Sequence, residues 1–481
     1  MLIAIILVRA YGLLFPFPGI TPREALLGYR GEVIRQTGSD ETGRKFPLIF
    51  TSSQTYLGPI STYLVAFSET VFGKSELSVR FPFVIMSIIG LLSLWWVVSK
   101  LFDSKIAIWS FAILGLCPWF ISLSLSPSEW YLYFNVLMIV GAILRRLFHG
   151  KAMWIWVGVF VFFIIIASRN VNFYSDPAII NGINNMRGQG SLYFPQDVWI
   201  KVFYNKSYYI VKLIQNIFIN TKWQFYFAQP DNNSIFGQSS VGLLLIGWIA
   251  PFVLGLIVTF REKKYRWLIF WWLFAIIPSI LSYPSPNQEK IIFASLPIGI
   301  IAAIGMVRVK PKWRAVILLT LVINFMFFGY DYFAKEQYRE SDKRCHGVEV
   351  LATWIQQHQN EYQDIYVSDS YCPDIGPILL YYGVSGKSNL YTGKLMSGGW
   401  INSVGNILIG QLEKWKLDPS HQTLLVLSSS NQNKILDRYH PISRTEKDAQ
   451  PCFSQVLEVY NSYQKPIFNL YKSVNPKCQL L

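Results

Sequence analysis

Charged residues are scarce in this sequence, and acids are the scarcer kind. Of its 481 residues only 15% are Asp, Glu, Lys or Arg, whereas an average soluble chain has about 25%. Hydrophobic residues make up 52% of the chain, so too few polar side chains are present to cover a soluble surface. The composition therefore excludes an ordinary soluble protein and indicates an integral membrane protein.

Motifs for metals and nucleotides are missing as well. The five cysteines include no Cys-x-x-Cys pair and there are only five histidines, so a Cys/His zinc site is not expected. There is no P-loop and no Gly-rich dinucleotide fingerprint. Four cysteines lie in the last third of the chain, where they are either free thiols or disulfide-bonded in a non-cytoplasmic compartment: Cys345, Cys372, Cys452 and Cys478.

Long apolar runs dominate the first two thirds of the chain. A membrane span needs about 20 mostly apolar residues, and nine segments meet or approach this length. The first lacks a small-residue cleavage site, so we interpret it as an anchor and not as a cleaved signal peptide. The nine predicted spans are 2–17, 81–101, 106–125, 130–148, 153–167, 241–260, 267–281, 291–307 and 315–332.

Most of the positive charge lies in short loops between these runs. The loops 99–105, 145–151, 261–266 and 308–314 hold thirteen basic and two acidic residues, which is eleven of the fifteen net positive charges. By the positive-inside rule these loops face the cytoplasm and the N-terminus lies inside. The excess of basic over acidic residues therefore indicates the membrane topology, and no nucleic-acid partner is expected.

The large segments then fall on the opposite side of the membrane. They are a first outer loop at 18–80, a second outer loop at 168–240 and a tail from 334. The tail predicts a soluble α/β domain, with a helix at 348–358, strands at 364–368 and 423–428, and a hairpin of 455–460 with 466–472.

We therefore expect an α-helical polytopic membrane protein of about nine spans, formed by residues 1–333. An extracytoplasmic α/β domain, residues 334–481, follows it. The expected location is the plasma (inner) membrane, with the C-terminal domain outside the cytoplasm.

The first outer loop carries acids beside an apolar surface. Glu24, Asp40 and Glu41 precede an amphipathic segment at 55–72, and such segments lie in the membrane interface. A carboxylate there is able to act as a general base toward an acceptor. An Arg at the mouth of a span is able to hold a lipid phosphate. Solvated loop acids and arginines that snorkel to the interface are the common alternative.

Taken in order, these features resemble the GT-C class of polytopic glycosyltransferases, in the branch of protein O-mannosyltransferases and lipid A aminoarabinose transferases. The resemblance covers about residues 10–333. It is carried by Pro22-Arg23-Glu24-Ala25, Gly38-Ser39-Asp40-Glu41-Thr42-Gly43 with Pro47-Leu48, Tyr56-Leu57-Gly58-Pro59, Phe72-Gly73-Lys74-Ser75 with Arg80-Phe81-Pro82, Cys117-Pro118-Trp119, and Phe225 with Asp231-Asn232-Asn233.

The resemblance implies an inverting transfer of a sugar from a polyprenyl-phosphate donor to an acceptor hydroxyl at the outer face. A loop carboxylate would deprotonate the acceptor, and basic groups would neutralise the phosphate leaving group. No cofactor is implied, and a divalent cation is left open. The implied partners are membrane lipid, the lipid-linked sugar donor, and a glycan, lipid or protein acceptor.

The implied site residues form three groups: catalytic acids, cations for the lipid phosphate, and residues that line the acceptor or donor cavity. The acids are Glu24, Asp40 and Glu41, the cations are Arg80, Lys290 and Arg44, and the cavity residues are Arg23, Glu129, Asp231 and Tyr56. No metal-ligating residues are expected.

Two positions depart from the pattern of the class. The catalytic Asp of the relatives' Asp-Glu pair falls on Arg23, so only Glu24 keeps a carboxylate there, and a Ser-Arg pair falls on Ser124-Leu125. A degenerate, non-catalytic membrane scaffold that binds a glycan or a partner is therefore kept as an alternative. A transporter or flippase is disfavoured, because Arg9 is the one charged residue near the centre of a predicted span.

Overall fold

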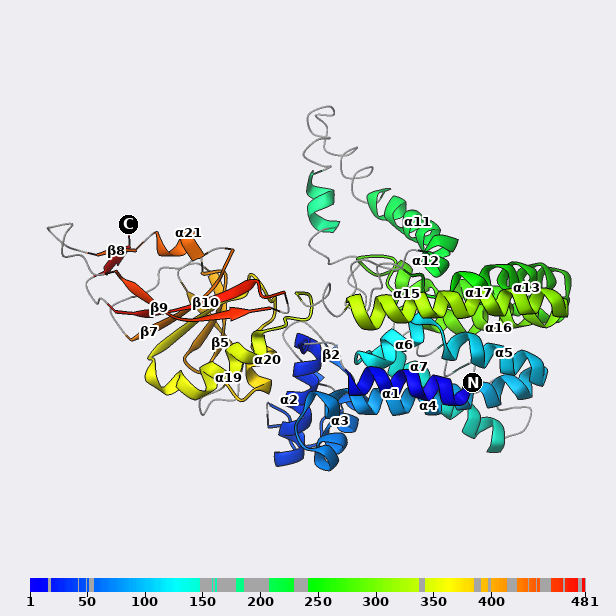
Figure 1. The fold of residues 1–481 in the computed structure, drawn as a ribbon, viewed down its shortest axis with the longest axis horizontal. Coiled ribbons are helices and arrows are strands. Elements are labelled where there is room, and N and C mark those ends of the chain that lie inside the picture. Colours follow the sequence, from blue (N-terminus) through cyan, green and yellow to red (C-terminus); the bar gives the residue numbers. More distant parts are fainter. Residues whose placement is uncertain are drawn as a thin grey trace. The chain divides into compact units, whose positions relative to one another are not determined.

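The computed structural model gives the elements of the chain (Figure 1). It describes residues 1–15, 19–41, 43–48, 50–51, 56–147, 158, 161, 179–185, 207–228, 241–336, 342–384, 391–396, 399–412, 422–430, 432–437, 439–441, 451–461, 463–474 and 478–480.

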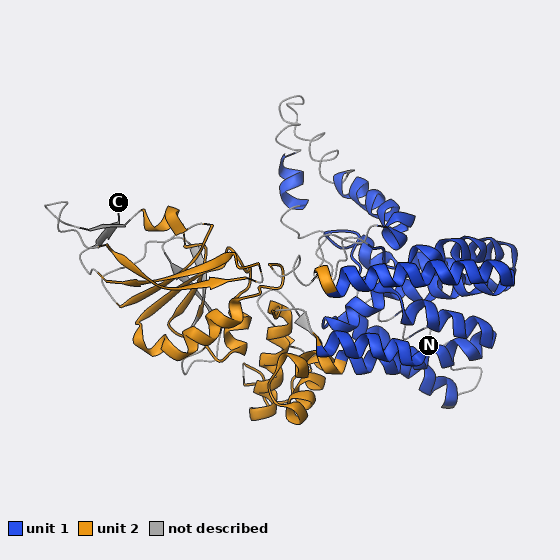
Figure 2. Ribbon diagram, viewed as in Figure 1, with its two compact units in different colours: residues 1–14, 83–333 blue, residues 15–82, 334–481 orange. Residues whose placement is uncertain are grey.

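The chain forms two compact units (Figure 2). Unit 1 consists of residues 1–14 and 83–333, and unit 2 of residues 15–82 and 334–481. One boundary between the units falls between residues 333 and 334, and the expected division into the domains 1–333 and 334–481 stays a prediction. The structure adds that the first outer loop belongs to the same compact unit as the tail.

Unit 1 is helical. Its apolar side chains are exposed as well as buried: on α17, Val316, Leu319 and Met326 are between 52% and 69% exposed. A helix that is apolar on all faces is expected where lipid replaces water. The helices are α1 (Leu2–Leu14), α4 (Glu76–Leu101, which begins in unit 2), α5 (Ser104–Gly115), α6 (Pro118–Leu125), α7 (Glu129–Leu147), α11 (Ser207–Thr221), α12 (Trp223–Phe227), α13 (Ile249–Arg261), α14 (Trp267–Ala275), α15 (Ile277–Ile280), α16 (Ser295–Arg308) and α17 (Pro311–Tyr330).

Two helices in the described part of the chain are long and apolar enough to cross a membrane, namely α4 and the stretch Pro311–Lys335. The helices α5 and α6 meet the same criterion as a pair that is bent by 55°. Shorter apolar helices are Leu2–Leu14, Ile246–Arg261 and Ile292–Arg308. Most of the predicted span 153–167 lies outside the described residues, and the count of nine spans and the inside N-terminus stay predictions.

Arg9 stabilises the bend between α5 and α6. Its side chain is fully buried. Its Nη1 donates to the carbonyl of Gly115, 2.9 Å away, and its Nε donates to Ser87 Oγ at 3.1 Å. The last carbonyls of a helix lack intrahelical partners and carry partial negative charge, so a cation at this end is favourable. The one charged residue near the centre of a predicted span therefore has a structural use, as the partner of a helix that stops at Gly115.

The tail forms a seven-stranded mixed sheet in the order β4-β5-β6-β3-β7-β10-β9. The central strand β3 is parallel to β6 and β7, and the remaining pairs are antiparallel. The strands are β3 (Asp364–Ser368), β4 (Tyr391–Met396), β5 (Gly399–Val404), β6 (Ile407–Gly410), β7 (Thr423–Ser428), β9 (Phe453–Tyr460) and β10 (Pro466–Ser473), with α19 (Val348–His358), α20 (Gly376–Tyr381) and α21 (Gln432–Leu436) as helices. Short pairs of β1 (Phe50–Thr51) with β2 (Tyr56–Leu57) and of β8 (Tyr439–Pro441) with β11 (Cys478–Leu480) complete the strands.

The sequence-based predictions for the tail are confirmed. The helix at 348–358 and the strands at 364–368 and 423–428 have the expected bounds. The hairpin is the antiparallel pair of β9 and β10. The open question of the thiols is answered as well, because Cys345 is bonded to Cys372 and Cys452 is also in a disulfide.

In unit 2 the first outer loop supplies two helices, α2 (Pro22–Thr37) and α3 (Pro59–Phe72). Helix α2 packs against α3 and against α20 of the tail. Two glycines one turn apart on α2 allow this close approach. A Cβ at Gly28 would lie 2.8 Å from Cδ2 of Tyr381, and one at Gly31 would lie 2.9 Å from Oε2 of Glu69. The first outer loop and the tail therefore share one interior.

Glycines also set the closest helix pair of unit 1. Helices α13 and α16 pack along much of their length. A Cβ built at Gly255 would overlap the carbonyl of Ile301, and one built at Gly305 would overlap the carbonyl oxygen of Pro251. Small residues at such positions let two membrane helices approach backbone to backbone.

We predict that Gly305→Ala destabilises the protein by roughly 1–3 kcal/mol, because backbone atoms are not able to move aside as a flexible side chain would. The measurement is the thermal midpoint of the purified full-length protein in detergent. Gly329→Ala is the matched control, since a Cβ at this α17 position would have nothing within 4 Å. Equal midpoints for the two variants would contradict the packing described for α13 and α16.

Candidate functional site

The candidate acid Glu24 and the candidate cation Arg80 form a buried ion pair. Arg80 Nε donates to Glu24 Oε1 at 3.0 Å, and Nη2 donates to Oε2 at 3.3 Å. Nη2 also donates to the carbonyl of Gly19 at 2.9 Å, and Nη1 lies 3.4 Å from Glu76 Oε2. Glu24 is 1% exposed and Arg80 is 2% exposed. The structure thus brings these two predicted site residues together and directs them at each other.

Glu24 has a second structural task at the start of α2. The Thr21 hydroxyl accepts from the Glu24 amide, and Glu24 Oε2 accepts from the Thr21 amide at 2.9 Å, which completes a capping box. This arrangement satisfies two amides that the helix itself leaves unpaired. A carboxylate in the first turn is further favoured by the positive end of the helix dipole. Position 24 is therefore a helix-start residue as much as a site residue.

The charge state of Glu24 follows from its neighbours. Burial alone would raise the pKa of this carboxyl, but the guanidinium charges of Arg80 and Arg344 outweigh it, so the pKa lies below its usual value. Glu24 is ionised at neutral pH. It is consequently a weak base that is also shielded from solvent.

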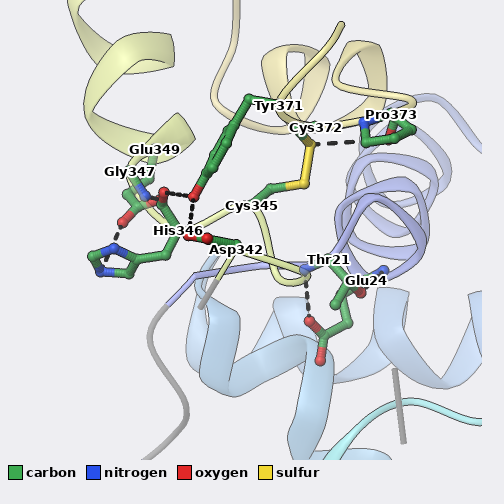
Figure 3. Close-up of a disulfide and its surroundings, with 10 residues drawn as sticks. All are labelled: Thr21, Glu24, Asp342, Cys345, His346, Gly347, Glu349, Tyr371, Cys372 and Pro373. Atoms are coloured by element: carbon green, nitrogen blue, oxygen red, sulfur yellow. Dashed lines mark hydrogen bonds and ion pairs between the residues drawn. A yellow bond between two sulfur atoms is a disulfide. The ribbon is translucent and has the colours of Figure 1, made fainter. Parts of the chain in front are cut away.

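Arg344 comes from a segment of the tail that a disulfide holds in place. The bond between Cys345 and Cys372 fixes this segment, and a Cβ at Gly19 would lie 2.9 Å from the Arg344 carbonyl oxygen and from Cα of His346. Figure 3 shows the disulfide together with Thr21 and Glu24. Tyr371, the neighbour of Cys372, donates to the carbonyl of His346 at 3.0 Å. The tail therefore contributes to the surroundings of the Glu24 carboxylate.

The other two candidate acids lie in the turn that follows α2. Asp40 Oδ1 accepts from the Arg44 amide at 2.8 Å, and Oδ2 lies 3.3 Å from Arg44 Nε. Glu41 Oε1 accepts from Nε of Arg30 at 2.9 Å, and Arg30 in turn lies over the ring of Phe50. The Arg44 side chain is 55% exposed and that of Glu41 is 18% exposed. This turn holds two acids and an accessible cation within a few residues of each other.

Unit 1 brings together the surroundings of Glu129 and Lys290. Ser128 Oγ donates to Glu289 Oε1 at 2.9 Å, which joins the start of α7 to the loop before α16. The amides of Glu289 and Lys290 both donate to Asn287 Oδ1, at 3.1 Å and 3.0 Å. Glu129 and Lys290 are half-buried.

The remaining predicted site residues are placed as follows. Arg23 is exposed on the first turn of α2, next to the buried Glu24. Tyr56 begins β2, where its backbone pairs with Thr51. Asp231 lies outside the described residues. At the two positions of the relatives' Asp-Glu pair, this chain therefore has one exposed residue, Arg23, and one buried residue, Glu24.

One acid of the first outer loop was missed by the sequence reasoning. Glu69 on α3 is 1% exposed, and neither carboxylate oxygen has a hydrogen-bond partner among the described residues. Burial and the nearby charge of Glu32 raise its pKa to about 8, against the opposite effect of Lys74. The available signal was its spacing, because Val65, Ala66 and Glu69 lie on one buried face of α3.

Comparisons with known proteins bear on this arrangement. Residues 57–173 match the family model of dolichyl-phosphate-mannose-protein mannosyltransferases. Among solved structures, ArnT from Cupriavidus metallidurans in the apo state matches with a TM-score of 0.51 and 11% sequence identity, over 98% of each chain. This chain has the fold of a GT-C glycosyltransferase. The resemblance inferred from the motifs is confirmed, as is the coarse expectation of a mostly helical membrane protein with a C-terminal sheet.

Further GT-C structures are less similar. ArnT from Cupriavidus metallidurans bound to undecaprenyl phosphate gives a TM-score of 0.49 at 12% identity, over 98% of this chain and 97% of that chain. The oligosaccharyltransferase AglB from Archaeoglobus fulgidus, in complex with an inhibitory peptide and a dolichol-phosphate, gives 0.42 at 11% identity, over 79% and 63%. A comparison of the sequence with curated proteins gave no match.

We predict that Arg80→Met destabilises the protein by about 3–5 kcal/mol, because it leaves the Glu24 carboxylate buried without its main counter-charge. Glu24→Gln should cost less, since Gln also serves in a capping box. The double variant should be more stable than Arg80→Met alone. Thermal or denaturant unfolding of the full-length protein measures this cycle, and simple additivity of the two changes would show that the pair is not coupled.

We predict that Glu69→Gln reduces the loss of stability that accompanies a rise in pH. The folded protein retains the Glu69 proton up to about pH 8, whereas an unfolded chain releases it near pH 4.5. Between these values the folded state binds more protons, so stability falls by about 1.4 kcal/mol per pH unit. Unfolding at pH 5.5 and pH 8 measures the difference. Glu361→Gln, a change at an exposed acid of the same unit, is the control and should keep the wild-type slope.

Proposed function

We propose that the protein is an inverting glycosyltransferase that moves a sugar from a polyprenyl-phosphate donor to an acceptor hydroxyl on the outer face of the membrane. The supporting observation is the match of residues 57–173, which begins within the first outer loop, to a family named for transfer from a dolichyl-phosphate sugar. A lipid-phosphate donor of this kind needs no nucleotide site. Membrane lipid, the donor and a glycan, lipid or protein acceptor are the proposed partners.

In the proposed reaction a loop carboxylate takes the proton of the acceptor hydroxyl. The acceptor oxygen attacks C1 of the sugar from the side opposite the phosphate. The bond between C1 and the phosphate oxygen breaks, and its electron pair leaves with the lipid phosphate. The configuration at C1 is inverted, and a cation stabilises the negative charge that builds up on the leaving group.

The contacts favour Glu41 over Glu24 as this base, and Asp40 is the second candidate. Both oxygens of Glu24 are engaged by Arg80 and the side chain is 1% exposed, so an acceptor would have to displace an ion pair to reach it. The Glu41 side chain is 18% exposed, whereas that of Asp40 is 2% exposed and is paired with Arg44. Glu24 then supports the loop from within.

The candidate phosphate-binding cations also differ in how far their charged groups are engaged by other residues. All three guanidinium nitrogens of Arg80 face Glu24, Glu76 or the Gly19 carbonyl, so we propose that Arg80 acts by holding Glu24. Arg44 in unit 2 and Lys290 in unit 1 are the proposed phosphate-binding cations. Arg23, Glu129, Asp231 and Tyr56 are the proposed residues of the acceptor or donor cavity.

A non-catalytic scaffold is the second candidate, and a specific observation favours it. At the position of the relatives' catalytic Asp the chain carries an exposed cation, Arg23, while the retained Glu24 is neutralised by Arg80. Such a protein would keep the fold and bind a glycan or partner through its outer domain without transferring sugar.

We predict that the purified full-length protein in lipid vesicles transfers labelled sugar from a polyprenyl-phosphate donor, and that Asp40→Asn or Glu41→Gln lowers kcat by roughly 10²–10⁴-fold. Lys290→Gln and Arg44→Gln test the phosphate cations. Glu361→Gln is the control, and unfolding curves establish that each variant is folded. Absence of transfer with every donor, together with binding of a glycan by the same protein, would favour the scaffold.

A further inference from the structure

A groove in unit 1 runs between α4 and α7, and its lining includes no candidate site residue. It has a volume of about 470 Å³, within the range of pockets that hold small ligands. Its walls are Leu92, Ser93, Trp95 and Trp96 on α4 and Ile143 on α7, and Arg146 stands at one end. The spacing of these residues places one face of each helix along the groove.

The walls are apolar and open to the surroundings. Leu92 is 38% exposed, Trp95 is 41% exposed and Ile143 is 52% exposed. Apolar side chains with this exposure on membrane helices contact acyl chains. Ser93 and Ala142 are the small residues of the lining, and their size leaves room that a larger side chain would fill.

One end of the groove is cationic and aromatic. Lys100 and Arg146 lie in the last turns of α4 and α7. The Lys100 ammonium is 5.9 Å from the centre of the Trp96 ring. Tryptophan and basic residues at the end of a membrane helix lie at the level of lipid headgroups. The nearest acid in the sequence, Asp103, stands at the N-cap position of α5 and makes no side-chain capping hydrogen bond.

We propose that this groove binds an anionic glycerophospholipid. One acyl chain follows the apolar wall, and the headgroup phosphate pairs with Arg146 and Lys100. Basic pockets between membrane helices at the cytoplasmic side bind anionic headgroups in this way. The loops next to Lys100 and Arg146 are two of the four that carry the positive charge of the chain, so the lipid belongs to the leaflet on that side. The proposed sugar donor acts at the opposite face.

The test uses full-length protein exchanged into vesicles that contain phosphatidylcholine and phosphatidylglycerol in equal amounts. Lipid that stays with the protein after purification in mild detergent is counted by native mass spectrometry. Phosphatidylglycerol should be retained in excess. Arg146→Gln and Lys100→Gln should each lower its retention about fivefold, and Ser93→Phe should lower it by filling the groove, with unfolding curves to establish that the variant is folded.

Lys312→Gln is the matched control. The Lys312 ammonium also lies 5.9 Å from a tryptophan ring, that of Trp313, at the start of α17. Helix α17 contributes no residue to the groove lining, whereas Lys100 and Arg146 lie on the two helices that form the groove. The Lys312→Gln variant should retain as much phosphatidylglycerol as the wild type. Equal loss in Lys312→Gln and Arg146→Gln, equal retention of the two phospholipids, or displacement of phosphatidylglycerol by polyprenyl phosphate would each overturn the proposal. None of these outcomes depends on whether the protein transfers sugar.

Discussion

Unit 2 depends on the pairing of Glu24 with Arg80. Each of these charges would be costly to bury alone, and their attraction offsets that cost only where geometry is good and the remaining polar atoms are satisfied. The Thr21 cap and the Gly19 carbonyl satisfy most of these atoms, and Nη1 of Arg80, which has no hydrogen-bond partner among the described residues, lies 3.4 Å from the Glu76 carboxylate. Because Arg344 also stabilises the Glu24 charge, the segment that the Cys345–Cys372 disulfide holds becomes part of the same balance. One ion pair therefore links the start of α2, the start of α4 and the tail.

This pairing changes what the motif of the first outer loop means. Adjacent residues on the first turn of a helix point in different directions, so an Asp-Glu pair supplies one outward and one inward carboxylate. Here the inward position is kept as Glu24, and the outward one is Arg23. The buried position of the motif keeps a carboxylate, and the exposed position carries the opposite charge. Under the proposed function, the more exposed Glu41 is then the favoured base of this loop.

The elements of the tail could be predicted from the sequence because their signals are local. Strands 364–368 and 423–428 are buried on both faces and appear as short apolar runs with sharp ends. The charges could not be predicted in this way. Nothing near Glu24 in the sequence indicates that its partner is 56 residues away, and nothing near Arg9 indicates the free carbonyls at the end of α5. Glu69 was missed because a polar residue on an amphipathic helix is assigned to the exposed face by default.

Unit 2 consists of two stretches that lie far apart in the sequence, so its parts are synthesised at different times. The first outer loop is complete at residue 82, but Tyr381, which covers Gly28 of α2, is synthesised about 300 residues later. At typical rates of synthesis this delay is about 15–60 s. During that time α2 and α3 have no tail to pack against, so the loop has to wait at the membrane surface or under the protection of a chaperone. A truncation anywhere in the tail is therefore expected to damage the loop at the other end of the chain.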